Sequence, residues 1–224
     1  MNKPKAIFFD LDGTLVDTSE GIVNHLNRAF EMMNLKVLPK SIIMKNVGYG
    51  ADYLATNCIA TYDVEKSKDA KLIEEVLSHF TYLYHKYPIE NTRLYQGVLE
   101  FLKNSDVLMG VISNKPEALV KVVLNELEII DYFRFEWGID TFDYHKPNPK
   151  IIETALHMFN IDKNDVWFIG DSFVDIQTAK GADVTSIALE DGFTPKSILT
   201  KECPDFQFKS FNEFSAWARK YFQT

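Results

Sequence analysis

Residues 6–14 read AIFFDLDGT. The first four of them form a short apolar run, which is typical of a strand buried on both faces of a parallel sheet. The run ends at Asp10, and Asp12 follows two residues later, before Gly13 breaks the pattern. A turn near a strand end accounts comfortably for one aspartate and one glycine, but less well for two aspartates. This pair of carboxylates therefore predicts a functional site at the end of the first strand.

The second half of the chain alternates between two apolar patterns. Continuous apolar runs at residues 107–112, 166–169 and 185–189 predict buried strands. Helical spacing of apolar residues between them predicts helices beginning near residues 98, 116, 151 and 173. Strands that alternate with helices predict an α/β fold, with a parallel sheet that has helices on both faces. In such sheets ligands bind at the carboxyl ends of the strands.

Residues 16–90 have a different character. Apolar residues at helical spacing predict one helix over 18–33 and another over 72–87. Asp17 and Glu20 resemble a capping box at the start of the first of these helices. We expect an inserted α-helical cap domain at 16–90, with the catalytic core formed by 1–15 and 91–224.

Three further polar groups follow predicted strands or lie in nearby loops. Ser113 and Asn114 come after one strand, and their side chains can donate hydrogen bonds to phosphate oxygens. Lys146 lies in a proline-rich loop, where a stiff backbone can fix one ammonium against a phosphate. Each of these features alone also fits an ordinary loop or helix start.

Gly170 is followed by Asp171, and Asp175 comes four residues after Asp171. A helix starting near residue 172 would let both carboxylates face the same opening. They also suit a helix N-terminus, where acids are favoured. Magnesium takes oxygen ligands, usually one or two carboxylates with water and substrate phosphate. Asp10 and Asp171 are therefore candidate ligands of Mg2+.

Composition limits the classes of function. The chain has 224 residues and a formal net charge of −8, which disfavours nucleic acid as a partner. No apolar run approaches the roughly 18 residues of a membrane span, so we expect no membrane insertion. Cys58 and Cys203 form no disulfide framework, and residues 1–5 lack signal-peptide character. A cytoplasmic location is expected.

In combination, four motifs resemble those of the haloacid dehalogenase-like hydrolase superfamily, over nearly the whole chain. They are Asp10-x-Asp12-Gly13-Thr14, Ser113-Asn114, Lys146-Pro147, and Gly170-Asp171-x3-Asp175. The resemblance implies the Rossmann-like core and the helical cap between the first two motifs. It also implies a magnesium-dependent phosphatase that passes through an aspartyl phosphate.

Carried over by position, the resemblance implies a role for each residue. Asp10 would be the nucleophile and a metal ligand, and Asp12 the general acid and base, with its backbone carbonyl on the metal. The remaining roles are phosphate binding by Ser113, Asn114 and Lys146, metal binding by Asp171, and support of the site by Thr14 and Asp175.

Within the superfamily the chain looks most like phosphoglycolate phosphatases. Residues 47–52, VGYGAD, are similar to their glycine-rich specificity loop, and Tyr49 in it could face the substrate. Residues 189–193, LEDGF, depart from that group's usual segment. A small phosphorylated metabolite is the expected partner. A phosphomutase resembling β-phosphoglucomutase, a pyrophosphatase or nucleotide phosphatase, and a non-catalytic phosphate sensor remain alternatives, and the oligomeric state stays open.

Overall fold

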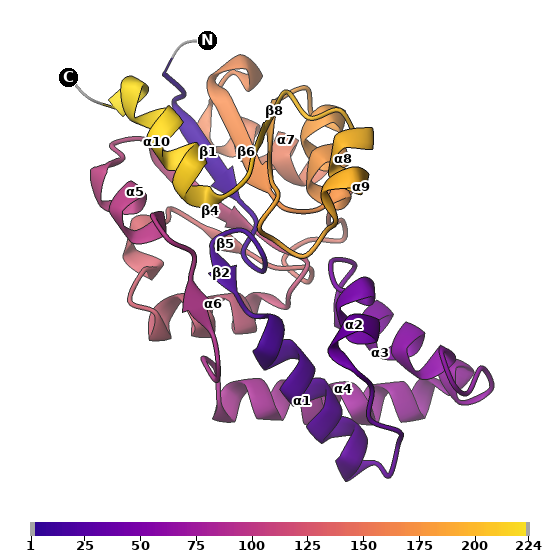
Figure 1. The fold of residues 1–224 in the computed structure, drawn as a ribbon. Helices are drawn as coiled ribbons and strands as arrows, with labels where there is room; N and C mark the ends of the chain where they lie inside the picture. Colours follow the sequence, from indigo (N-terminus) through magenta and orange to yellow (C-terminus); the bar gives the residue numbers. More distant parts are fainter. Residues whose placement is uncertain (1–2, 223–224) are drawn as a thin grey trace.

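A six-stranded sheet forms the centre of the computed structural model, which describes residues 3–222 (Figure 1). The strand order is β5-β4-β1-β6-β7-β8, and every neighbouring pair is parallel. The first strand therefore lies between β4 and β6, where the direction of winding reverses and a crevice opens beyond the strand ends. The predicted α/β fold is confirmed. The strands are β1 (Ala6–Phe9), β4 (Leu108–Ile112), β5 (Glu136–Trp137), β6 (Val166–Gly170), β7 (Thr185–Leu189) and β8 (Phe206–Phe208).

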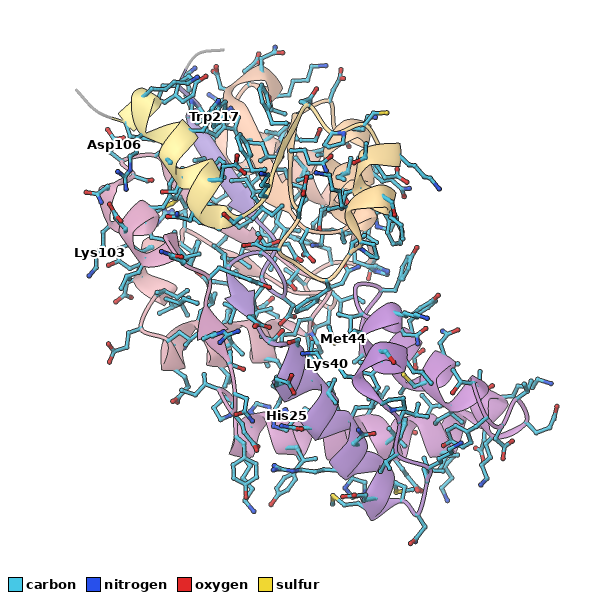
Figure 2. The ribbon with its side chains drawn as sticks, in the orientation of Figure 1. His25, Lys40, Met44, Lys103, Asp106 and Trp217 are labelled. Carbon is cyan, nitrogen blue, oxygen red and sulfur yellow. The ribbon has the colours of Figure 1, made fainter. Side chains whose placement is uncertain are left out.

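Successive side chains of β1 enter two different cores. Ile7 and Phe9 pack with helices α5, α6 and α10 on one face, whereas Ala6 and Phe8 pack with α7 and α8 on the other. Both faces are buried, which explains why this strand is apolar throughout. On α10, Trp217 packs against Trp167 of β6 with ring centroids 5.3 Å apart (Figure 2). These helices are α5 (Val98–Asn104), α6 (Glu117–Glu126), α7 (Lys150–Phe159), α8 (Phe173–Gly181), α9 (Lys196–Lys201) and α10 (Phe211–Phe222).

Four helices between β2 and β3 form a separate group beside the sheet (Figure 1). They share their own hydrophobic cluster, in which Phe30, Val76 and Ile59 are fully or almost fully buried. Leu119 of α6 also belongs to this cluster, so the helical group is packed against the α/β part. We call this group the cap. Its helices are α1 (Ser19–Met32), α2 (Lys40–Ile43), α3 (Ala51–Ala60) and α4 (Ala70–Lys86).

The chain enters and leaves the cap through a small antiparallel ribbon. Strand β2 (Val16–Asp17) pairs with β3 (Arg93–Leu94), and the ion pair between Asp17 and Arg93 closes at 3.0 Å. Sequence reasoning found no strand here, because two residues are too few to show a period. The ribbon fixes the two cap connections side by side.

The predicted capping box at the start of α1 is wrong. Thr18 is the N-cap residue and makes no side-chain cap bond. Asp17 instead accepts hydrogen bonds from the backbone and the hydroxyl of Ser19. The capping box occurs at α8, where Ser172 and Asp175 bond each other's backbone amides.

Within residues 3–222, none of the helices combines the length and the apolar character that a membrane span requires.

Candidate active site

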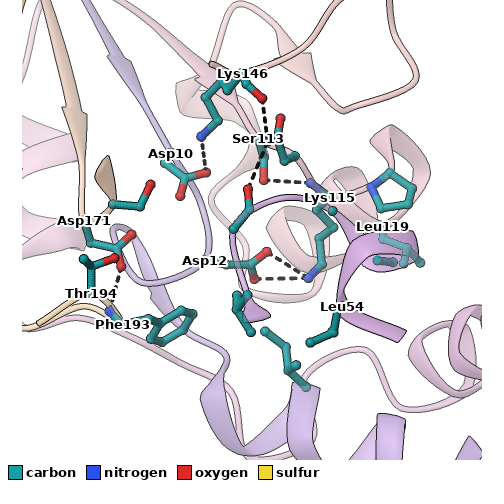
Figure 3. A pocket seen from close by; sticks show the side chains of 18 of the residues that line it. Asp10, Asp12, Leu54, Ser113, Lys115, Leu119, Lys146, Asp171, Phe193 and Thr194 are labelled. Atoms are coloured by element: carbon teal, nitrogen blue, oxygen red, sulfur yellow. Dashed lines mark hydrogen bonds and ion pairs between the residues drawn. The ribbon is translucent and has the colours of Figure 1, made fainter. Parts of the chain in front are cut away.

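A pocket opens at the carboxyl ends of β1, β4 and β6, between the sheet and the cap (Figure 3). Asp10 and Asp12 follow β1, Ser113 and Asn114 follow β4, and Asp171 follows β6. Lys146 reaches the same pocket from the loop before α7. Six of the eight residues predicted for the site therefore line one cavity, as expected from the shared edge of parallel strands.

Lys146 lies between two carboxylates. Its Nζ is 2.8 Å from Oδ1 of Asp10 and 2.6 Å from Oδ1 of Asp175. Burial alone would lower the pKa of Lys146, but the two carboxylates outweigh this effect and raise it. The lysine therefore remains an ammonium beside Asp10. Asp175 serves two purposes here, because its other oxygen accepts from the backbone and hydroxyl of Ser172.

Each carboxylate oxygen of Asp171 accepts a hydrogen bond from a different loop. Thr14 donates its hydroxyl to Oδ1 at 3.2 Å, and the backbone amide of Phe193 donates to Oδ2 at 2.6 Å. Two glycines make room for this carboxylate: a Cβ on Gly13 or Gly192 would collide with it. Gly13 also has a φ of +93°, which favours glycine. The loops after β1 and β7 thus define where Asp171 points.

The aspartates fit a divalent metal. Asp10, Asp171 and Asp175 each offer an oxygen, and these three atoms lie within 4.8 Å of one another. Burial raises the pKa of Asp10 to about 7, against the opposing effect of Lys146, and burial with the neighbouring Asp10 raises that of Asp171 well above its usual range. A cation would relieve this repulsion, and hard oxygen donors suit ions such as Mg2+. Both oxygens of Asp175 are engaged by Lys146 and Ser172, and both oxygens of Asp171 by Thr14 and Phe193.

Asp12 contacts Lys115, a residue to which sequence reasoning had assigned no role. The Nζ of Lys115 lies 3.1 Å and 3.0 Å from the two carboxylate oxygens of Asp12, and the hydroxyl of Thr18 donates to Oδ1 at 2.7 Å. On its other side Lys115 lies over the ring of Tyr84 on α4, 4.4 Å from the centroid. Lys115 therefore connects Asp12 to the cap. Its position directly after Ser113-Asn114 was the one available signal.

Ser113 and Asn114 have different surroundings. The Ser113 oxygen accepts from the backbone of Lys115 at 3.2 Å, which leaves its hydroxyl hydrogen to donate elsewhere. Asn114 uses its amide group to donate to the carbonyls of Gly48 and Lys146, both at 2.9 Å. In this structure the Asn114 side chain therefore joins loops and offers no amide hydrogen to a phosphate.

The Gly48 bond shows that the cap loop rests on the core. Gly50 faces Ile139 so closely that a Cβ would lie 2.7 Å from its Cδ1. Tyr49, the aromatic residue that could face the substrate, packs against Tyr53 and Phe173, with centroids 4.6 Å and 5.4 Å away. Its ring thus connects cap and core and is not among the described residues that line the pocket.

A comparison with models of protein families shows which family the chain belongs to. Residues 7–189 match the model of the haloacid dehalogenase-like hydrolases. The chain belongs to this family. The match spans most of the sheet and all of the cap of this hydrolase.

Curated relatives of the hydrolase are phosphatases. It is 31% identical over 204 residues to a phosphoglycolate phosphatase of Pseudomonas savastanoi pv. phaseolicola, covering 90% of this chain and 75% of that protein. It is 29% identical over 217 residues to one from Colwellia psychrerythraea, covering 95% and 96%. The crystal structure of a predicted phosphoglycolate phosphatase from Haemophilus somnus superposes with a TM-score of 0.89 at 26% identity, covering 97% and 99%. The predicted reaction class, a hydrolase of the phosphatase type, is confirmed.

Proposed function

We propose that this hydrolase cleaves a small phosphomonoester in a magnesium-dependent reaction that passes through an aspartyl phosphate on Asp10. The observation that supports this most strongly is the contact of Lys146 with Asp10, in a pocket that also contains Asp12 and Asp171. These groups supply a nucleophile, a countercharge, a proton donor and a metal ligand within one cavity. The relatives' names make phosphoglycolate the reference substrate.

In the first step an oxygen of Asp10 attacks phosphorus while the bond to the leaving oxygen breaks. Lys146 and the Ser113 hydroxyl hold the phosphoryl oxygens and compensate their charge. Asp12 gives a proton to the leaving oxygen, so that the alcohol departs neutral. The phosphoryl group then remains on Asp10.

In the second step Asp12 takes a proton from water, and the water oxygen attacks the phosphorus of the aspartyl phosphate. Inorganic phosphate leaves and Asp10 is restored. Asp10 and Asp171, with the backbone carbonyl of Asp12, would hold the metal. When bound, it screens the attacking carboxylate from the negative phosphate.

We also propose that residues 16–90 form a cap domain on the catalytic core. The proposed location of the protein is the cytoplasm. Both cysteines are free thiols, which suits a reducing compartment. The cap would exclude water during the first step and admit it for the second.

The test is phosphate release with and without Mg2+ from a panel of phosphomonoesters, including phosphoglycolate, a sugar phosphate and a nucleotide. We expect release that requires the metal and falls at least about a thousandfold in Asp10→Asn, since the amide cannot act as nucleophile. Asp143→Asn, at an exposed loop position with no assigned role, is the control. Phosphate release by Asp10→Asn at the wild-type rate would disprove the assignment of Asp10 as the nucleophile.

A further inference from the structure

The side of the pocket that faces the cap is apolar. Ile22, Leu54 and Phe80 contribute from α1, α3 and α4, and each is at most 5% exposed. Leu119 and Phe193 add apolar surface from the core. Figure 3 places Leu54 and Phe193 on the opposite side of Asp12 from Lys146. We call the side formed by Ile22, Leu54, Phe80, Leu119 and Phe193 the apolar wall. With the phosphate at Lys146, the alcohol part of a substrate would extend past Asp12 toward this wall.

The two lysine ammonium groups that line the pocket each contact carboxylates of the protein. Its lining includes three carboxylates, Asp10, Asp12 and Asp171, and two ammonium groups, Lys115 and Lys146. Lys146 contacts Asp10 and Asp175. Lys115 contacts both oxygens of Asp12, and its side chain is 7% exposed. Among residues 3–222, each lysine that lines the pocket therefore already contacts a carboxylate. A second anionic group on the substrate would meet apolar side chains with no free ammonium from this lining, which is unfavourable for a buried charge.

The apolar wall belongs to a closed arrangement of cap and core. The hydrogen bond from Asn114 to the Gly48 carbonyl joins the cap loop to the loop after β4. Tyr49 also rests on Phe173 of α8. An alcohol group enclosed here would lose its water on both sides, which favours hydrocarbon and disfavours charge.

We infer that the substrates of this hydrolase are phosphomonoesters whose alcohol part is uncharged and rich in hydrocarbon. The inference rests on the proposed phosphatase function and narrows it. Phosphoglycolate, whose alcohol part ends in a carboxylate, is then a poor substrate. Each methylene group placed against the wall raises kcat/KM by about fourfold.

Isobutyl phosphate and phosphoglycolate form a matched pair for the test. They have the same heavy-atom skeleton, with an isopropyl group in place of the carboxylate. Steady-state phosphate release with Mg2+ should give a kcat/KM at least about tenfold higher for isobutyl phosphate, since the wall accepts the neutral group and rejects the charged one. The isobutoxide is the more basic leaving group, so intrinsic reactivity does not produce this order.

Two variants of one wall residue provide the second measurement. Leu54→Lys places an ammonium in the wall, and Leu54→Met places an unbranched neutral chain of similar length there. The ratio of kcat/KM for phosphoglycolate to that for isobutyl phosphate should be at least about tenfold higher in the lysine variant than in the methionine variant. Circular dichroism and thermal melting establish that both variants fold, and the wild-type comparison stands without them.

The outcomes separate the inference from the function on which it rests. A wild-type preference for phosphoglycolate over isobutyl phosphate overturns the inference and leaves the phosphatase function intact. An absence of metal-dependent phosphate release from every phosphomonoester tested overturns the proposed function and the inference together.

Discussion

Lys115 joins the proton donor of the proposed reaction to the cap. It lies within 3.1 Å of both oxygens of Asp12 and over the ring of Tyr84. Burial alone would lower the pKa of Lys115, but Asp12 outweighs burial and raises it, so Lys115 stays an ammonium beside the half-buried Asp12 side chain. Removing one member of such a pair leaves the other uncompensated.

Lys115→Met should therefore lower kcat by about 10- to 100-fold, because Asp12 loses the contact that orients it. The measurement is steady-state phosphate release, with KM determined alongside kcat. Lys121→Met, which breaks the half-exposed pair with Glu117, should leave kcat unchanged. A wild-type kcat in Lys115→Met would show that Asp12 needs no such partner.

His25 is buried on α1 in the cap, beside the ring of Tyr84 (Figure 2). Within residues 3–222 neither ring nitrogen has a hydrogen-bond partner. Burial lowers its pKa to about 4, against the opposing effect of Glu90. The unfolded chain, with a histidine pKa near 6.5, binds the proton more readily than the folded protein does.

Stability should consequently fall as the pH drops from about 6.5 to 4, by on the order of 3 kcal/mol from this residue. Urea unfolding at several pH values measures this dependence. His25→Phe should flatten it, whereas His157→Phe, at an exposed position, should not. Equal pH dependence in wild type and His25→Phe would rule out His25 as the source.

At the scale of elements, the strands that could be predicted were those with continuous apolar runs. Strands β1, β4, β6 and β7 were found because both faces of each are buried, which gives an uninterrupted run. Strand β5, with Glu136 and Trp137, was missed because two residues have no readable period. Helix α10 was not predicted, although Phe211, Phe214 and Ala218 are buried at helical spacing.

The sequence also predicts only part of the site. Asp10 and Asp171 could be placed because each follows a readable strand, and Lys146 because two prolines follow it. The contact between Lys115 and Asp12 could not, since it joins residues 103 positions apart through tertiary packing. The bonds of Asn114 to Gly48 and Lys146 likewise exist only when cap and core meet.

Gly192, in the loop after β7, provides an element-scale prediction. A Cβ there would collide with the Asp171 side chain, so Gly192→Ala should displace Asp171 and weaken Mg2+ binding by at least about tenfold. Titration calorimetry measures the affinity. Gly48→Ala, where φ is +118° but the space is open, is the control for local strain away from Asp171. Unchanged Mg2+ affinity in Gly192→Ala would contradict this account of the loop.

Over the whole molecule, the metal should contribute to stability. Asp10, Asp171 and Asp175 repel one another in a buried site, so the metal-free protein stores unfavourable charge at the sheet edge. Mg2+ at a hundred times its Kd should stabilise the folded state by about 2.7 kcal/mol.

Asp171→Asn should raise the stability of the metal-free protein and reduce the additional stability that Mg2+ provides. The metal-free variant should be more stable than the metal-free wild type by about 1 kcal/mol or more, because repulsion is relieved. Its stabilisation by Mg2+ should largely disappear. Thermal melts with EDTA and with Mg2+ measure both effects, and a full Mg2+ response in the variant would exclude Asp171 as a ligand.

The central claim is that Asp10 accepts the phosphoryl group. The direct test uses Asp12→Asn with p-nitrophenyl phosphate, whose leaving group departs without a proton while hydrolysis of the intermediate lacks its base. Reduction with borohydride after rapid quenching converts an aspartyl phosphate to homoserine, which peptide mass spectrometry locates. Homoserine at position 10 is the predicted result. Homoserine at another aspartate, or none while the variant still releases a burst of nitrophenolate, would contradict the account.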